Sequence, residues 1–334
     1  MKKNNPLVSV CIISYNSSNV IVETLESIKN QTYKNIELII SDDCSTDNTV
    51  EVCEKWLDKN KYRFSNGEII TSPINTGTSI NLNRGLKQSN GIWVKIMAAD
   101  DLLFPHSIDA FLKYSTENNK KACVSKLDYF GNVNKAKQKE YSYDLFYNRY
   151  SKLDVSGKYK MLLSECLLPM PGLFILKELL VAIDYIDEKY TFGEEWPTYM
   201  KILERNIDLA YFDEKLVSYR SSEDSLSGKK YVNTDKGVAY TPAKRKVFSD
   251  SLKFFNDYRK PQLKKRRMYL QIWSQILGYK MADLRFESKL SVGDKIKLTL
   301  MQLIYPVTYT RIFQYIHSGR VHYIFFRLKN IFKF

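Results

Sequence analysis

Apolar and amphipathic stretches alternate along the first hundred residues of the chain. Four apolar stretches rich in β-branched side chains are predicted to be buried strands: 7–15, 36–41, 67–73 and 91–99. Three stretches between them are predicted to be helices: 21–30, 49–57 and 77–89. Strands that alternate with helices at this pace predict parallel βαβ units, so the expected fold class is α/β.

The pattern beyond residue 110 is less regular. We expect a strand over 121–131, loop and surface over 135–153, a helix over 157–168, a loop leading to a strand or helix over 169–180, a helix over 194–206, a mobile loop over 226–242, and helices from about 243 to the end. Pro197 falls in the first turn of the helix expected over 194–206, where proline is tolerated.

Composition is typical of a globular protein with a substantial core. Of 334 residues, 44% are apolar and 26% are charged. The five cysteines never form a CxxC pair, which argues against a disulfide framework or a zinc site and fits a reducing compartment. No run reaches the roughly 18 apolar residues of a membrane-spanning helix. The first apolar run is too short for a signal peptide.

The positive charge is concentrated in the last quarter of the chain. Residues 251–334 contain 17 Lys and Arg against 4 Asp and Glu, a net +13, whereas the whole chain carries +14. Aromatic and basic residues interleave there, which favours a helix in a membrane interface beside anionic lipid heads. Packing on the rest of the chain, or a contact in a homo-oligomer, is the alternative. No nucleic-acid-binding motif accompanies the charge, so nucleic acid is not an expected partner.

Three polar pairs follow predicted strands: Tyr15–Asn16, Asp42–Asp43 and Asp100–Asp101. Ligands of open α/β sheets bind at the carboxyl ends of the strands, so the three pairs predict one ligand site. A carboxylate after a strand also serves as a turn former or helix cap, and each pair taken singly is open to that interpretation. Paired carboxylates suit Mg²⁺ or Mn²⁺, which commonly use one or two carboxylates plus substrate phosphates.

The segments "VSVCIISYN", "QTYKNIELIISDDCSTDNT" and "NTGTSINLNRGLKQSNGIWVKIMAADD" resemble the family 2 glycosyltransferases, which are inverting nucleotide-sugar enzymes with a GT-A fold. The resemblance runs from about residue 7 to 105 and resumes at 190–227. It implies a Rossmann-like, mixed and mostly parallel sheet flanked by helices, with a C-terminal helical extension. It also implies a nucleotide-diphosphate sugar donor, most often a UDP-sugar, and Mn²⁺ or Mg²⁺ as cofactor.

The same resemblance implies roles for residues near the donor nucleotide. Tyr15 and Asn16 would line the nucleotide pocket. Asp43 would accept a hydrogen bond from the uracil ring, and Asp42 would assist it. The family's "N-x-G" region beside the nucleotide is matched by Asn75, Gly77, Asn83, Arg84 and Gly85.

The family's metal motif reads Asp-Ala-Asp-Asp, and this chain has Ala98-Ala99-Asp100-Asp101 in its place. The resemblance therefore makes Asp100 the direct metal ligand on the donor diphosphate and leaves Asp101 beside it. Ala98 stands where the family has its first carboxylate, which would normally contact ribose or metal-bound water.

The resemblance places the catalytic base at the start of the helix expected over 194–206. Glu195 falls where the family usually has its catalytic aspartate, and Glu194 is the reserve candidate. The alternative is that both glutamates only stabilise the helix N-terminus through its dipole. "SYRSSEDSLSG" resembles the end of the family's second region. There Arg220 would support the diphosphate or a closing loop, and Ser222 replaces a histidine.

These observations predict a three-part chain: residues 1–110 bind the nucleotide sugar, 111–242 bind the acceptor, with "PMPGLF" at 169–174 shaping its pocket, and 243–334 form a basic amphipathic helical region. The predicted function is inverting hexosyl or N-acetylhexosaminyl transfer to a glycan or lipid-linked glycan in bacterial surface polysaccharide synthesis. The predicted location is cytoplasmic, peripheral on the inner face of the cell membrane. A nucleotidyltransferase is disfavoured because "YNSSN" is not a glycine- and lysine-rich phosphate loop. A catalytically degenerate scaffold subunit is the remaining alternative.

Overall fold

The computed structural model describes residues 5–131, 143–163, 166–191 and 193–221, and the short segments 231–234, 237–240, 250, 253–254 and 257–258. The chain divides into two compact units, 1–229 and 230–334. In the second unit, β9 (Tyr231–Thr234) and β10 (Gly237–Tyr240) pair antiparallel. The stretch expected to be a mobile loop over 226–242 therefore contains a hairpin, built from segments that carry the Tyr, Val and Thr typical of strands.

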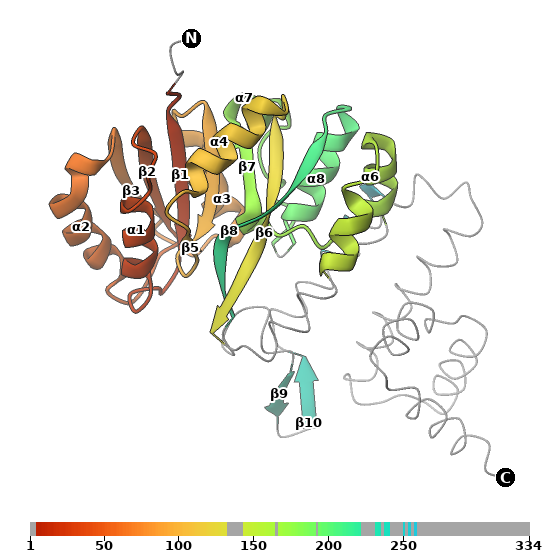
Figure 1. Ribbon diagram of the computed structural model, residues 1–334. Helices are drawn as coiled ribbons and strands as arrows, with labels where there is room; N and C mark the ends of the chain where they lie inside the picture. Colours follow the sequence, from red (N-terminus) through yellow and green to blue (C-terminus); the bar gives the residue numbers. More distant parts are fainter. Residues whose placement is uncertain are drawn as a thin grey trace. The chain divides into compact units, whose positions relative to one another are not determined.

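The first unit is built on one mixed sheet of eight strands, in the order β3-β2-β1-β4-β7-β6-β8-β5 (Figure 1). The strands are β1 (Val8–Ser14), β2 (Ile36–Asp42), β3 (Asn66–Thr71), β4 (Trp93–Ala98), β5 (Leu102–Leu103), β6 (Ala122–Gly131), β7 (Leu173–Leu176) and β8 (Leu209–Ser221). Strands β1 to β4 pair parallel, as do β6 and β8, whereas β7 and β5 run antiparallel to their neighbours. The predicted mostly parallel α/β sheet is confirmed.

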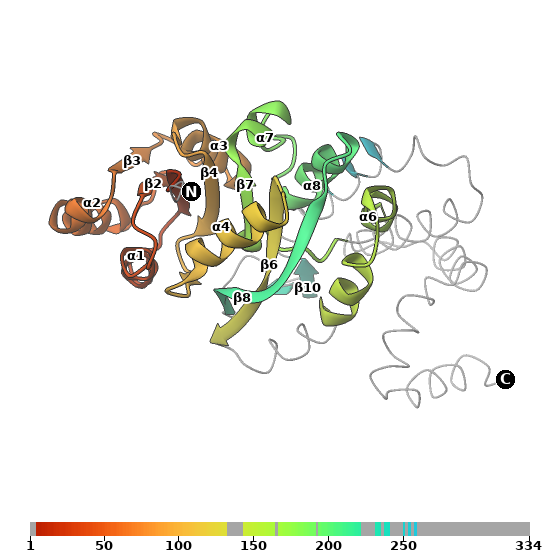
Figure 2. The same cartoon turned by 45° about the horizontal axis from the view of Figure 1, so that its top comes forward.

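Helices cover both faces of the sheet (Figure 2). They are α1 (Ile21–Lys29), α2 (Thr49–Asn60), α3 (Thr78–Gln88), α4 (Ser107–Glu117), a helix at 143–150, α6 (Val155–Leu162), α7 (Lys177–Ala182) and α8 (Glu195–Glu204). Two 3₁₀ turns complete the described elements: η1 (Lys61–Arg63) and η2 (Met170–Gly172). Helices α1, α2 and α4 lie on one face of the sheet, and α3 and α7 lie on the other (Figures 1 and 2).

Two expectations for the irregular middle of the chain need correction. The stretch 135–153 was expected to be loop and surface, but its described part forms a helix at 143–150. Its aromatic residues Phe146, Tyr147 and Tyr150 recur at helical spacing and are buried, which makes this helix amphipathic. The helix expected over 157–168 ends earlier, at Leu162. The other expected strands and helices of the first unit occur with shifted ends, and 169–180 resolves into η2, β7 and α7.

Close packing of α3 against the sheet brings its polar side chains to the carboxyl edge. On one face, Val8, Val10 and Ile12 of β1 join the main apolar core. On the other face, a Cβ added at Gly85 of α3 would lie 2.5 Å from Cys11 Sγ. Only glycine lets α3 approach the sheet this closely.

The predicted division at residues 110 and 242 remains a prediction. Apart from residues 253–254 and 257–258, the basic region 251–334 lies outside the described residues, as does Ser222. The expectations of a C-terminal helical extension, a membrane contact and a homo-oligomer therefore stay predictions. Within the part of the chain that the structure describes, no helix has both the length and the apolar character needed to cross a membrane.

Candidate active site

Asn16 ties the loop after β1 to the loop after β2. It adopts the left-handed region with φ 49°, which asparagine tolerates better than most residues. Its backbone N–H donates to Ser45 Oγ at 2.8 Å, and its Oδ1 accepts from the Thr46 N–H at 2.8 Å. The preceding Tyr15 is 48% exposed at the same edge. Of the two residues predicted to line the nucleotide pocket, Tyr15 therefore offers an exposed ring, and Asn16 holds the neighbouring loop in place.

Asp42 is buried at the end of β2, and its carboxylate shapes the loop that follows. It accepts hydrogen bonds from Ser14 Oγ at 2.8 Å, from the Ser45 N–H at 2.8 Å and from Ser45 Oγ at 2.6 Å. Asp42 therefore acts as a turn former, which was the alternative interpretation of a carboxylate that follows a strand. The structure supplies Asp42 with a structural task, and its assisting role toward a base remains a prediction.

Asp43 joins the loop after β2 to the loop that leads into α3. Its carboxylate accepts from the Thr76 N–H at 2.9 Å and the Gly77 N–H at 2.6 Å, and it lies 3.4 Å from the Arg84 guanidinium. Gly77 has φ 87°, so an L side chain would strain the backbone even though nothing lies within 4 Å of its would-be Cβ. Asn75, which was predicted to lie beside the nucleotide, is exposed in this loop.

Arg84 of α3 completes the same network. It donates to Asn81 Oδ1 at 2.9 Å, to Thr76 Oγ1 at 2.9 Å and to the Asp42 carbonyl at 3.3 Å. Together with Asp43, it holds the loop after β2 and the loop that leads into α3 in one arrangement. We refer to Asn16, Asp42, Asp43, Gly77 and Arg84 as the donor-side network.

The opposite side of α3 fixes the segment that precedes α8. Asn83 donates to the Ile186 carbonyl at 2.9 Å and to Glu188 Oε1 at 2.8 Å, and it accepts from the Ile186 N–H. Ser79 donates to the Tyr190 carbonyl. Helix α3 therefore connects the donor-side network to the approach to Glu194 and Glu195.

Asp100 and Asp101 follow β4 at the same edge of the sheet. Asp101 is fully buried; its Oδ1 accepts from the Arg220 N–H at 3.1 Å, and its Oδ2 has no hydrogen-bond partner among the described residues. Burial raises the pKa of Asp101 well above its usual range, and the charge of Asp100 adds to this shift. Burial also raises the pKa of Asp100, which Arg220 opposes. The site therefore stabilises two carboxylates incompletely and would favour an added cation.

Arg220 at the end of β8 is brought directly to these aspartates. Its Nε donates to the Asp100 carbonyl at 3.1 Å, and its guanidinium donates to Glu23 Oε2 of α1 at 2.7 Å. The guanidinium lies over the Phe130 ring, 4.5 Å from its centroid. The geometry thus shows Arg220 holding the end of β4, and its predicted contact with a diphosphate remains a prediction.

The residues present fit the divalent cation that the family implies. The pair offers only oxygen ligands, which Mg²⁺ and Mn²⁺ prefer, and Asp101 Oδ2 is a buried acceptor without a partner. Among the described residues, no group of three or more His, Cys, Asp and Glu could hold a metal ion. A cation at Asp100 would therefore need substrate phosphates to complete its ligands, which is the usual arrangement for Mg²⁺.

Glu194 and Glu195 stand at the start of α8. Glu194 accepts from the Gly193 N–H through Oε2 at 3.0 Å, and its carbonyl accepts from Thr198 Oγ1 at 2.6 Å. Glu195 is half-buried, and burial followed by the charge of Glu194 raises its pKa to about 8. Such a carboxyl group is a stronger proton acceptor than an ordinary glutamate once it is ionised.

Two tyrosines lie near enough to Glu195 to be affected by its charge. The charge of Glu195 adds to the burial that raises the pKa values of Tyr143 and Tyr199. Tyr199 is one turn after Glu195 in α8, and within the described part of the chain its buried hydroxyl has no hydrogen-bond partner. Trp196 donates its indole N–H to the Leu162 carbonyl at 2.5 Å, which fixes α8 against α6. Among the described residues, no hydrogen bond or ion pair joins Glu195 to Asp100.

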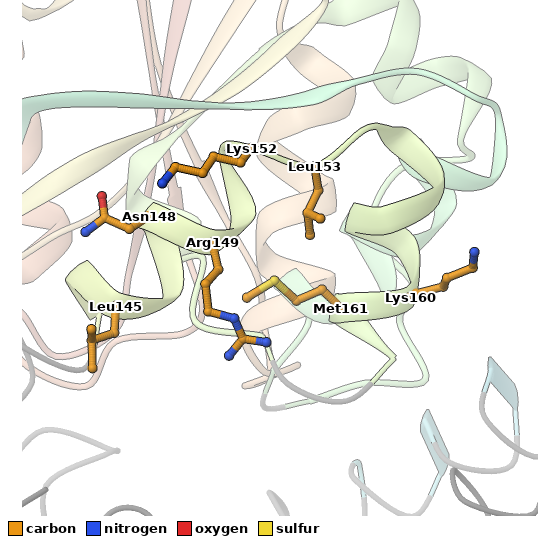
Figure 3. Close-up of a pocket in the computed structure, with 7 residues that line it drawn as sticks. All are labelled: Leu145, Asn148, Arg149, Lys152, Leu153, Lys160 and Met161. Carbon is orange, nitrogen blue, oxygen red and sulfur yellow. The ribbon is translucent and has the colours of Figure 1, made fainter.

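A separate pocket of about 610 Å³ lies over the helix at 143–150 and α6 (Figure 3). Its lining residues are Leu145, Asn148, Arg149, Lys152, Leu153, Lys160 and Met161. The charged ends of Arg149, Lys152 and Lys160 point away from one another in Figure 3. They do not converge on one position, so the pocket provides no focused anion site and is not part of the candidate active site.

Several residues that organise the site were missed by sequence reasoning. These residues are Glu23, Thr76, Ser79, Asn81 and Lys95. Three of them, Ser79, Asn81 and Lys95, left a signal in the sequence. Buried polar residues in α3 depart from an ordinary apolar core face, and a lysine inside the apolar strand "WVKIMA" requires buried partners. Glu23 and Thr76 gave no signal, because their partners are distant in sequence.

The sheet and the carboxylates at its carboxyl edge define an α/β protein with a ligand site at the strand ends. The family model described as "Glycosyl transferase family 2" matches residues 9–174. The chain belongs to this family, and the predicted family assignment is confirmed.

Several curated relatives of the chain are named as uncharacterised glycosyltransferases. An uncharacterised glycosyltransferase of Rickettsia typhi is 29% identical over 227 residues, which cover 65% of each chain. One of Haemophilus influenzae is 38% identical over 117 residues, 35% of each chain. The putative teichuronic acid biosynthesis glycosyltransferase TuaG of Bacillus subtilis is 25% identical over 262 residues, 78% of this chain and 98% of TuaG. The matched part thus spans two thirds or less of the first two relatives.

Solved structures share the fold. The mannosyltransferase PcManGT of Pyrobaculum calidifontis, in complex with GDP-Man and Mn²⁺, aligns over 99% of this chain and 88% of its own with a TM-score of 0.59 and 14% identity. S. aureus TarS 1–349, in complex with UDP-GlcNAc, aligns over 87% and 78% with a TM-score of 0.56 and 17% identity. At these identities the likeness concerns the fold alone.

Proposed function

We propose that the chain transfers a sugar, with inversion, from a nucleotide-diphosphate donor to a hydroxyl of a glycan or lipid-linked glycan in surface polysaccharide synthesis. The observation that carries the proposal is the position of Asp100 and Asp101. They follow β4 at the carboxyl edge of the sheet, and Arg220 donates hydrogen bonds to both of them. Strand β4 pairs with β1, and the loop after β1 carries Asn16 of the donor-side network. The family assignment and the relation to TuaG support the polysaccharide context.

Donor binding would rest on the donor-side network. Tyr15 offers an exposed ring for a flat base, and uracil is the expected base. Asp43 and Arg84 keep the loops around it in place at no further ordering cost. Asp100 would hold Mn²⁺ or Mg²⁺ on the diphosphate, where the cation neutralises charge that develops on the leaving group.

Acceptor activation would rest on Glu195. In its ionised form it would take the proton from the attacking hydroxyl, and the proton would remain on its carboxyl group. The raised pKa of Glu195 makes that transfer more favourable than it would be to an exposed glutamate. Glu194, which accepts from Gly193, would fix the start of α8 and raise the pKa of its neighbour.

A nucleotide-sugar screen tests this function. Thermal shifts and nucleotide release are measured with UDP-glucose, UDP-N-acetylglucosamine and GDP-mannose, with Mn²⁺ or with EDTA. We expect stabilisation and release with at least one UDP-sugar, only in the presence of Mn²⁺, and loss of both in Asp100→Asn. Stabilisation without release in wild type under every condition would favour the scaffold-subunit alternative.

A further inference from the structure

Lys95 is a fully buried lysine in the middle of β4. Its Nζ donates to the carbonyls of Ile96 at 2.8 Å, of Leu173 at 3.3 Å and of Pro171. The ammonium also lies 5.6 Å from the centroid of the Phe111 ring. Three carbonyl acceptors match the three N–H donors of one ammonium group.

Burying an ammonium group at this position is unfavourable, which suggests that Lys95 has a specific role. An isolated ammonium loses its hydration on burial, and an apolar side chain of similar length would fill the same space in the strand without that cost. Burial lowers the pKa of Lys95 to about 7, while the charge of Asp101 opposes this shift. The carbonyls and Asp101 are therefore the compensation for the buried charge.

Two of the three carbonyls belong to the 3₁₀ turn η2 and the residue after it. The turn is also confined from its other side, because a Cβ added at Gly172 would lie 2.7 Å from the Ser125 carbonyl of β6. Lys95 and Ser125 thus enclose the turn between β4 and β6. Lys95 is on β4, the strand that precedes Asp100 and Asp101, so its side chain links that turn to the strand that leads to the aspartates.

The donor-side network does not depend on this lysine. The loops after β1, β2 and β3 bond to one another and to α3, whereas the described hydrogen-bond partners of Lys95 belong to β4, η2 and β7. The turn lies within residues 111–242, the part of the chain predicted to bind the acceptor.

We propose that Lys95 is a positioning residue that fixes the turn Met170–Gly172 relative to Asp100 and so orients the acceptor hydroxyl rather than the donor. This proposal rests on the proposed function, because it assumes that a sugar is transferred at Asp100. A displacement of about 1 Å in such a site costs up to roughly 100-fold in rate.

The test compares Lys95→Met with the wild type in three measurements. These are the affinity for UDP with Mn²⁺, the ratio of sugar transferred to octyl β-glucoside to sugar released to water, and amide hydrogen exchange. We expect UDP affinity within twofold, a transfer-to-hydrolysis ratio lowered at least tenfold, and faster exchange confined to residues 166–176. A general structural defect would change all three.

Two further variants keep the test decisive if Lys95→Met folds poorly. Gly172→Ala moves the same turn by collision with Ser125 and leaves Lys95 intact, so we expect the same selective loss of transfer. Lys177→Met is the matched control: Lys177 is a half-buried lysine that donates to the Leu86 carbonyl and to Ser89 Oγ, and it follows β7 at the opposite edge of the sheet. We expect it to leave the ratio unchanged.

The outcomes separate this proposal from the proposed function. A wild type that binds none of the nucleotides contradicts the function itself. A wild type that binds UDP, together with a Lys95→Met variant whose ratio is unchanged or whose UDP affinity falls tenfold, overturns the role of Lys95 alone.

Discussion

The two groups of carboxylates at the edge of the sheet are stabilised in opposite ways. On the donor side, Asp42 and Asp43 are surrounded by donors and each accepts at least three hydrogen bonds. On the reaction side, one oxygen of Asp101 has no partner in the part of the chain that the structure describes, and burial raises the pKa values of Asp101 and Glu195. The first group is complete without a ligand, whereas the second is completed only by a cation or a proton.

This difference separates two functions of the carboxylates in the family motif: fixing loops, and binding a cation or a proton. Saturated carboxylates fix loops and change little when a substrate arrives. A buried carboxylate with too few hydrogen-bond donors is unfavourable in the free protein, and a bound metal ion or a transferred proton removes that unfavourable free energy. We therefore expect substitutions on the donor side to act on stability and affinity, and substitutions on the reaction side to act on rate and pH dependence.

Glu195→Gln is the change expected to have the largest effect. The amide keeps the size of the side chain but cannot accept the proton, so we expect the transfer rate to fall roughly 10²–10⁴-fold. UDP affinity should stay within threefold, since Glu195 is not in the donor-side network. Initial rates and calorimetric titration with UDP and Mn²⁺ give both numbers.

Glu194→Gln is the matched control for that experiment, and we expect a smaller loss of rate. A larger loss in Glu194→Gln than in Glu195→Gln would exchange the two roles. A rate within threefold of wild type in both variants would mean that neither glutamate at the start of α8 is the catalytic base.

The stability of the fold should fall with rising pH because of the same residue. The pKa of Glu195 is about 8 in the fold against 4.5 unperturbed, so between these values the unfolded chain releases a proton that the folded chain retains. The contribution is fully present below pH 4.5 and is lost as pH rises through 8. We expect the unfolding free energy of wild type relative to Glu195→Gln to decrease by at most about 1.4 kcal/mol per pH unit in this window.

Urea unfolding of both proteins at pH 5, 6, 7 and 8 measures this difference. A difference that is constant across the series would mean that Glu195 ionises normally in the fold. Glu195 would then no longer belong to the incompletely stabilised carboxylates of the reaction side.

Asp43→Ala tests the donor side. It removes the acceptor of the Thr76 and Gly77 N–H groups and leaves Arg84 without its ion pair. Unsatisfied buried donors cost about 1–3 kcal/mol each, so we expect stability to fall by about that amount and UDP affinity by roughly tenfold or more. The transfer rate at saturating donor should change least.

Asp109→Ala is the matched control, because Asp109 also accepts from a neighbouring loop, through Thr32 Oγ1, but is exposed in α4. We expect it to leave UDP affinity unchanged. If Asp43→Ala instead lowered the saturated rate and spared affinity, Asp43 would belong to the reaction side.

The donor half of the fold was predictable because its signals are local. Strands β1, β2 and β4 are mostly apolar and are followed by the polar pairs that the family motif assigns. The reaction half was less predictable because its determinants are distant in sequence. Burial raises the pKa of Glu195, and Tyr143, whose own pKa Glu195 helps to raise, comes from the helix at 143–150, a stretch that was expected to be loop and surface.

The site residues divide in the same way. Asp43 and Arg84 were predicted beside the nucleotide and are brought together, yet their mutual contacts could not be predicted from spacing. Arg220 was predicted at a diphosphate, and the structure adds its contacts with Asp100 and Glu23, which come from 120 and 197 residues away. Spacing along the chain carries no information about pairs this far apart.

Glu23→Gln is the change expected to have the smallest effect, and it tests where the reaction side ends. The Glu23–Arg220 pair is partly exposed, with 56% of the Glu23 side chain accessible, and exposed ion pairs contribute roughly 0–1 kcal/mol. Arg220 also keeps its contacts with Asp100, Asp101 and Phe130 in this variant. We therefore expect stability within 1 kcal/mol of wild type and a transfer rate within threefold. A tenfold loss of rate, measured at saturating donor and Mn²⁺, would mean that α1 takes part in holding Asp100 and that the reaction side extends onto the first helix.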